Sequence, residues 1–133
     1  MSIKQKGISI QISPGELLDK VSILEIKLEQ ITDSQKKSNV KIEYDLLMNI
    51  VANNNLLTHE VTLLYQQLKS INQSLWTIED DIRDCERDKD FSDQFIKLAR
   101  SVYITNDKRA EIKKQINTTL GSVLVEEKSY QSY

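Results

Sequence analysis

One stretch of the sequence aligns side chains that could bind or act on a ligand. Between residues 71 and 86, two stripes with alternating four- and three-residue spacing run side by side along a predicted helix. The first stripe is apolar. The second carries the chain's single tryptophan with an amide, two carboxylates and a guanidinium: Asn72, Trp76, Glu79, Arg83 and Glu86. Beside a packed face such groups lose part of their water, which is where charge pairs and shifted pKa values arise.

The chemistry of this stripe has two interpretations. Glu79 and its neighbour Asp80 are the candidate catalytic groups, because either carboxylate could act as a general base on a bound substrate. Trp76 would stack against a ring of the ligand, and Arg83 would hold an anionic group. The alternative is a solvated helix face with ion pairs three and four residues apart and Trp76 at the edge of the core. Spacing alone favours the alternative.

A second stripe of mixed polarity lies further along the chain. Polar side chains interrupt an apolar face that reads Ala99, Val102, Asn106, Ala110, Lys113 and Asn117. Further polar side chains lie close to this face: Arg100, Tyr103, Asp107 and Arg109. If it meets the Trp76 face, the two enclose a polar pocket between helices, a common place for ligands. An ordinary amphipathic helix with a polar flank is the alternative here.

These side chains need helices to position them, and the first helix has a clear start. Ser13 is placed as its N-cap, Pro14 stands at the first helical position, and Glu16 completes a capping box. Apolar residues at helical spacing then continue to about residue 32. The polar residues 32–39 are expected to form the first loop.

The second helical stretch is unusually long. From residue 47 to residue 85 an apolar pattern at four-three spacing contains one polar residue, Asn54, and no Gly or Pro. An unbroken helix over 41–87 would be about 70 Å long and would make the protein elongated. We expect either this spine or a break near 53–55 or 70–74, where polar side chains compete for the backbone.

The third helix is predicted over 91–120, after a loop at 87–92, and Gly121 is placed to end it. The simplest arrangement is an all-α, elongated antiparallel helical bundle, with one long central helix along which the other two pack. A single domain would then span residues 1–133.

Short extended segments are expected at both termini. Residues 8–12 alternate between apolar and polar side chains, which is typical of a strand. Val123 and Val125, in the tail at 122–133, could pair with them as a two-stranded ribbon.

The composition excludes several classes of protein. The 133 residues contain 3 Gly and 1 Pro, none of them between Glu16 and Leu120. A β-sandwich, a P-loop and a dinucleotide fold all need such residues in their turns, so these folds are excluded.

The net charge of −2 favours no nucleic-acid partner. Because the sequence has no apolar run of about 18 residues, we expect no membrane insertion and a cytoplasmic protein.

The sequence has few residues suited to binding a metal or a cofactor. The chain has one His, His59, and one Cys, Cys85, so a zinc site would need carboxylates for nearly all its ligands. A nucleophile elbow, a Walker lysine and a His-Glu-x-x-His pair are absent from the sequence. We therefore expect no metal and no cofactor.

Several segments together resemble a family of short, uncharacterised bacterial and phage proteins, classed as a domain of unknown function. They run from Ile12 to Lys20, Ile23 to Lys27, Asn72 to Arg83, Phe95 to Tyr103, Asn106 to Ala110 and Gly121 to Tyr130. The resemblance implies a setting in surface-glycan assembly, because members often lie near genes for surface-polysaccharide synthesis. It also implies that these residues match motif positions: Lys20, Lys27, Asn72, Trp76, Glu79, Asp80, Arg83, Arg100, Tyr103, Asn106, Asp107 and Arg109.

Together, these observations favour a protein that binds a small polar or anionic metabolite, such as a sugar phosphate or nucleotide sugar, between helices. Cations would hold the anion, namely Lys20, Lys27, Arg83, Arg100 and Arg109. Trp76 and Tyr103 would stack a ring, and Asn72, Asn106 and Asp107 complete the ligand-binding set. The competing hypothesis is a non-enzymatic, coiled-coil-like scaffold that organises larger enzymes through its long apolar seam.

A homodimer is a separate expectation. The predicted spine is long for one small domain, and Asn54 stands at a seam position, where a buried amide fixes the register of paired helices.

Overall fold

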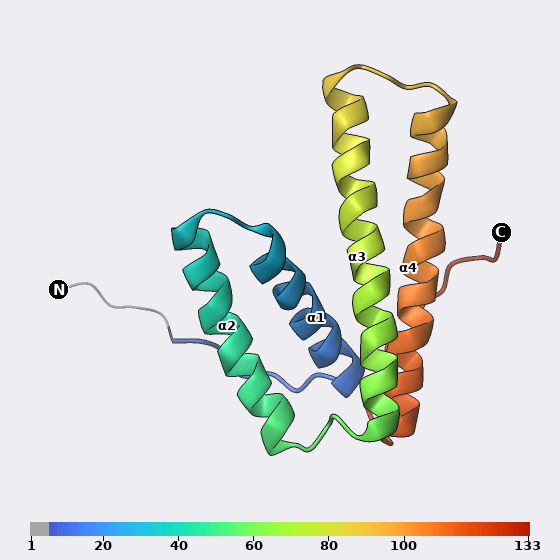
Figure 1. Ribbon diagram of the computed structural model, residues 1–133. Coiled ribbons are helices and arrows are strands. Elements are labelled where there is room, and N and C mark those ends of the chain that lie inside the picture. Colours follow the sequence, from blue (N-terminus) through green and yellow to red (C-terminus); the bar gives the residue numbers. More distant parts are fainter. Residues whose placement is uncertain (1–5) are drawn as a thin grey trace.

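The computed structural model describes residues 6–133 and contains four α-helices (Figure 1). The helices are α1 (Pro14–Gln30), α2 (Ser34–Asn53), α3 (His59–Arg87) and α4 (Asp93–Thr119). No strand occurs within residues 6–133, and the all-α prediction is confirmed. Over the same part of the chain, no helix has the length and apolar character needed to cross a membrane.

The helices form two hairpins of unequal length (Figure 1). α3 and α4 run antiparallel and pack along each other, and the shorter α1–α2 hairpin leans against one half of them. α1 is the middle layer, because it packs against α2 and also against α3 and α4. The other half of the α3–α4 hairpin extends beyond α1 as a two-helix arm, which we call the arm.

The hydrophobic core lies where α1 meets the other helices. Its fully buried side chains come from all four: Leu18, Val21, Val51, Val61, Leu68 and Ile116. Past Asn72, α3 has one more buried residue, Cys85. The arm therefore has little core of its own, and the tightly packed part of the molecule ends near Asn72.

The predicted start of α1 is confirmed in its main features. Ser13 Oγ accepts a hydrogen bond from Glu16 N at 3.2 Å, and Pro14 is the first helical residue. The Glu16 side chain differs from a capping box, because its carboxylate bonds to Lys113 Nζ on α4 at 2.7 Å. The first turn of α1 is thereby tied to α4.

The expected long helix over 41–87 is two helices, so a continuous central spine was wrong. The break falls at 54–58, at the first of the two expected places, while 70–74 is helical. Asn55 takes a left-handed backbone with φ of 50°, which Asn tolerates better than most residues, and it ends α2 where Gly is usual. Thr58 then caps the start of α3 with its side chain.

Asn54 consequently does not lie on a helix–helix seam. It is the exposed residue at the end of α2, and its Nδ2 donates to the carbonyl of Ile50 at 2.8 Å. Both premises of the dimer argument, the continuous spine and the buried amide, are therefore wrong. The homodimer itself stays a prediction.

The first loop is shorter than expected, because residues 34–39 belong to α2. The predicted loop at 32–39 was inferred from polarity alone. Asp33 explains the difference, since its carboxylate accepts a hydrogen bond from Lys36 N at 2.9 Å and caps the helix. A good N-cap starts a helix even where the following turns are polar and exposed.

The last helix and the loop before it lie within two residues of the expected 91–120 and 87–92. Gly121 ends α4 as predicted, with φ of 65°. The tail at 122–133 then turns back along α4 (Figure 1). The predicted ribbon between the tail and residues 8–12 is wrong, because neither segment is in a strand.

Candidate ligand-binding site

A buried carboxylate organises the junction of α1, α3 and α4. Asp19 on α1 is 1% exposed, and its Oδ1 accepts hydrogen bonds from Asn72 Nδ2 and Arg109 Nε, each at 2.9 Å. A second nitrogen of Arg109 bonds to Oδ2, so the guanidinium holds the carboxylate at two points. The hydrogen bond to Asp19 raises the pKa of Arg109. Each charge compensates the other in a place where an unpaired charge would be very costly.

Asn72 is fixed by the same cluster. Its Nδ2 also donates to Ser22 Oγ at 2.8 Å, and that hydroxyl donates to the backbone oxygen of Asp19 at 2.7 Å. Both hydrogens of the amide are thus used by α1. No residue within 6–133 donates to Asn72 Oδ1, which leaves this oxygen as the acceptor available to a ligand.

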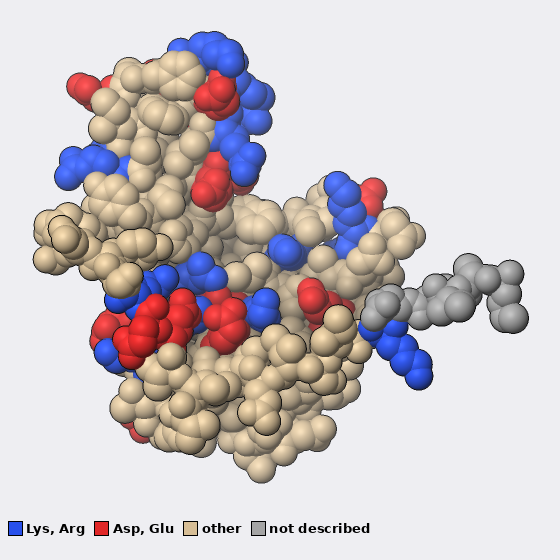
Figure 2. All heavy atoms as spheres, turned by 180° about the vertical axis from the view of Figure 1, so that it is seen from behind, with Lys and Arg blue, Asp and Glu red and all other residues tan. Residues whose placement is uncertain are grey.

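A groove opens beside this cluster, between α1, α3 and α4, with a volume of about 430 Å³. Four apolar side chains line part of it: Ile23, Ile26, Leu75 and Trp76. The polar lining is Asn72, Glu79, Asp80, Arg83, Asn106 and Arg109. We call it the Trp76 groove. The protein is hollowed between the arm and the α1–α2 hairpin, and charged side chains gather in a band across this face (Figure 2).

Seven of the twelve predicted site residues line the Trp76 groove: Asn72, Trp76, Glu79, Asp80, Arg83, Asn106 and Arg109. Side chains from the two predicted polar faces, on α3 and α4, therefore meet. Tyr103 and Asp107 line a second cavity, to which Asn106 and Arg109 also belong. Lys20, Lys27 and Arg100 line neither cavity, and the structure does not bring them to the groove.

One of the two arginines that line the groove is not available to bind an anion, contrary to the expectation from the sequence. Arg109 is committed to Asp19, so it is not a free anion-binding group. Arg83 lies 3.8 Å from Glu79, and the two side chains are 72% and 49% exposed. This pair is solvated, as the alternative interpretation of the stripe proposed. The inner wall, by contrast, is held in a fixed geometry by the buried Asp19 cluster.

The groove is therefore suited to binding. It offers an indole, carboxylates that accept hydrogen bonds, and amide and guanidinium groups that donate them. Within residues 6–133, no three His, Cys, Asp or Glu side chains gather as metal ligands.

Asp19 and Ser22 were missed by the sequence interpretation, which took from α1 only its apolar faces and the two cations Lys20 and Lys27. A signal was present: Gly15, Asp19 and Ser22 follow four-three spacing on α1. Small and polar residues on a helix that is apolar on its other side indicate a close, hydrogen-bonded contact with a second neighbour. Lys113 was noted as part of the polar stripe but not as a site residue.

Lys113 joins three segments of the chain. Its Nζ lies 2.7 Å from Glu16 on α1 and 3.1 Å from Glu126 in the tail, and 4.0 Å from Asp19. Burial lowers the pKa of Lys113, but the hydrogen bonds to Glu16 and Glu126 outweigh it, and the net shift is upward. The hydrogen bond between Lys113 and Glu126 also holds the pKa of Glu126 below its ordinary 4.5.

Acid is expected to loosen the tail. Because the folded pKa of Glu126 lies below 4.5, its stabilising contribution is fully present above that pH and fades as the pH falls through the folded value. The ¹H–¹⁵N heteronuclear NOE of residues 124–133 should therefore be constant from pH 7 to about 5, and lower below. Glu126→Gln should give a low NOE at every pH, whereas Glu127→Gln should behave like the wild type. Equal acid response of the wild type and Glu126→Gln would contradict this.

The comparisons with known proteins agree with the resemblance noted in the sequence. Residues 8–133 match a family described as a family of unknown function, DUF6165. The chain belongs to this family. The match contains every residue of the Trp76 groove and of the Asp19 cluster, although the family brings no assigned activity. No curated protein and no solved structure matches the chain.

Proposed function

We propose that this member of DUF6165 binds a small polar metabolite, of the sugar phosphate or nucleotide sugar class, in the Trp76 groove. One observation carries the proposal: an indole and six polar side chains, drawn from α3 and α4, line a single groove whose inner wall is fixed by buried hydrogen bonds. Its volume of about 430 Å³ is within the ~300–1,000 Å³ of small-molecule sites.

The groove's side chains suit the parts of such a ligand. The flat face of a sugar ring would pack on Trp76, and its hydroxyls would donate to Asn72 Oδ1 and to the carboxylates of Glu79 or Asp80. The phosphate would bind Arg83, the cation of the groove that has no buried partner. If the protein turns over its ligand, Glu79 or Asp80 would be the general base.

The biological setting extends the proposal. Surface-glycan assembly in the cytoplasm would supply ligands of this class. The setting is supported by the resemblance of the sequence segments, and the cytoplasmic location by the sequence alone.

A thermal-shift screen tests the binding, because a ligand that binds only the folded protein raises its melting temperature. We expect a shift with glucose 1-phosphate or a nucleotide sugar. Trp76→Ala, and the double variant Glu79→Lys with Arg83→Glu, should weaken binding at least tenfold. Asp84→Lys with Arg87→Glu is the matched control, since it reverses an exposed pair on the same helix outside the groove.

Two results would count against the groove. The first is a shift induced by glucose 1-phosphate that survives both groove variants. The second is the absence of any shift with sugar phosphates and nucleotide sugars at millimolar concentration.

A second candidate function is protein–protein association, as a scaffold or a homodimer. The observation that favours it is an exposed apolar stripe on α2, where Ile42, Leu46 and Ile50 follow four-residue spacing. Light scattering distinguishes the states: association predicts a mass above that of one chain, reduced to one chain by Leu46→Glu. A single-chain mass at high concentration would remove the homodimer.

A further inference from the structure

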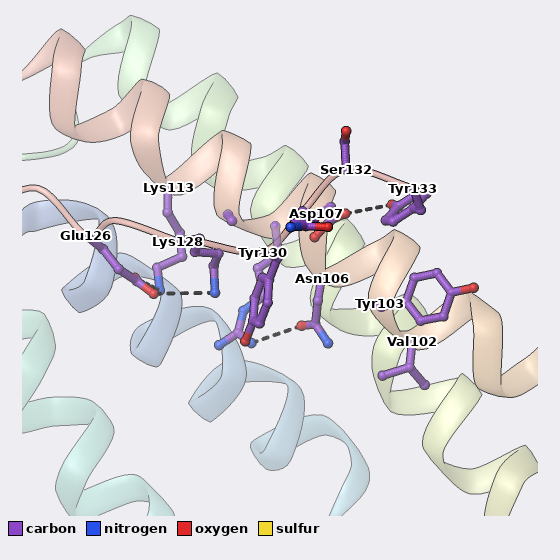
Figure 3. A pocket seen from close by; sticks show the side chains of 13 residues that line it. Val102, Tyr103, Asn106, Asp107, Lys113, Glu126, Lys128, Tyr130, Ser132 and Tyr133 are labelled. Carbon is purple, nitrogen blue, oxygen red and sulfur yellow. Dashed lines mark hydrogen bonds and ion pairs between the residues drawn. The ribbon is translucent and has the colours of Figure 1, made fainter.

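The C-terminal tail and α4 together line a second cavity, which is open to solvent and has a volume of about 810 Å³ (Figure 3). Its lining comes from one face of α4 between Val102 and Lys113, and from the tail between Glu126 and Tyr133. We call it the tail cavity. It is separate from the apolar core and is large enough for a nucleotide.

The tail cavity is lined by aromatic side chains. Tyr133 donates to Asp107 Oδ2 at 2.6 Å, and its ring packs edge-on against Tyr103 at 5.3 Å between centroids. These contacts hold the end of the tail on α4. Tyr130 stands at the cavity between Lys128 and Asn106, and it is 82% exposed (Figure 3). Its ring therefore has a free face on which a planar group could stack.

In the tail cavity, the carboxylate of Glu126 lies between two lysine side chains. Glu126 lies 3.1 Å from Lys113 Nζ and 3.6 Å from Lys128 Nζ, so the tail's own carboxylate occupies the space between the two ammonium groups. Lys128 Nζ is also 5.7 Å from the centre of the Tyr130 ring. A phosphate group is the kind of ligand that would compete for this position, because it carries more charge and more acceptor oxygens than a carboxylate.

The two cavities share part of their lining. Asn106 and Arg109 belong both to the tail cavity and to the Trp76 groove. A ligand in one cavity would therefore contact side chains of α4 that also line the other.

We propose that the tail cavity binds a nucleoside diphosphate, with its base on Tyr130 and its phosphates between Lys113 and Lys128 in place of Glu126. The observations that support this nucleotide site all come from the tail cavity. Its extension, in which a sugar attached to the diphosphate reaches the Trp76 groove, rests on the proposed function.

Calorimetric titration of the full chain with UDP and ADP tests the site. We expect both to bind, Tyr130→Ala to weaken them about tenfold through lost stacking, and Lys128→Ala to weaken them by a similar factor. Pyrophosphate, which has no base, should bind more weakly and be insensitive to Tyr130→Ala. Trp76→Ala should leave UDP binding unchanged. Lys97→Ala, which removes an exposed lysine of α4 outside the tail cavity, is the control for Lys128→Ala.

The outcomes separate this proposal from the proposed function. Sugar phosphate binding without any nucleotide binding overturns the tail site alone. Nucleotide binding that is lost in Trp76→Ala but not in Tyr130→Ala or Lys128→Ala overturns it as well, because the ligand is then in the other groove. Nucleotide binding with the expected pattern, but no response to sugar phosphates, supports the tail site and counts against the Trp76 groove.

Discussion

Asp19→Asn is expected to lower the free energy of unfolding by about 3–5 kcal/mol, the largest effect of any single substitution we consider. The carboxylate is buried, and two cations face it, Arg109 directly and Lys113 at 4.0 Å. Asparagine has nearly the same shape, so little packing is lost. What is lost is the negative charge, which leaves the guanidinium half-buried without a counter-charge.

Urea unfolding followed by circular dichroism measures this change, with Asp45→Asn as the matched control. Asp45 forms an exposed pair with Lys41 at 2.8 Å, and its loss should cost less than about 1 kcal/mol. A double-mutant cycle with Arg109→Gln should show a coupling of about 1.5 kcal/mol or more. A cost below 1 kcal/mol for Asp19→Asn, or an absent coupling, would mean that the pair does not hold the junction together.

Gly15→Ala is expected to lower the free energy of unfolding by about 2 kcal/mol, within the ~1–3 kcal/mol typical of overpacking. A Cβ at this position would lie 2.5 Å from the backbone oxygen of Lys113 and 2.9 Å from Asn117 Oδ1. Backbone cannot rotate away as a side chain can, so α1 and α4 would have to separate. The movement would also stretch the hydrogen bond from Gly15 N to Asn117 Oδ1, now 2.7 Å.

The control for this substitution is Gly7→Ala, where an added Cβ meets no atom within 4 Å. It should change stability by less than about 0.5 kcal/mol, as surface substitutions usually do. If Gly15→Ala were as stable as Gly7→Ala, the close approach of α1 to α4 would be wrong. Because Asp19 lies one turn further along α1, a shift here should also weaken the Asp19–Arg109 pair.

The sequence predicted those parts of the fold that depend on local signals. The start of α1 at Ser13 and Pro14 and the end of α4 at Gly121 follow from caps, which act within a few residues. The stripe from Asn72 to Arg83 was identified from spacing, and its side chains do line one groove. Spacing shows which residues share a face whether or not the neighbouring helix is known.

The parts of the fold and of the site that the sequence did not predict depend on contacts between distant segments. The partner of Asn72 is Asp19, 53 residues away, and no local pattern links the two. The prediction of a continuous spine was wrong. The apolar pattern keeps its phase across 54–58 and so gives no sign of a break, although Asn55 turns the chain there. The tail's attachment through Lys113 and Tyr133 is likewise a long-range contact, and it replaced the predicted ribbon.

The most direct test of the account is the indole N–H signal of Trp76 in a ¹H–¹⁵N correlation spectrum. The chain has one tryptophan, so this signal reports on the groove alone. Titration with glucose 1-phosphate, or with a nucleotide sugar, should shift the signal in a saturable way, also in the control variant Asp84→Lys with Arg87→Glu. The double variant Glu79→Lys with Arg83→Glu should abolish the shift. An indole signal that stays in place at millimolar concentrations of every sugar phosphate, nucleotide sugar and nucleotide tried would contradict the proposed function.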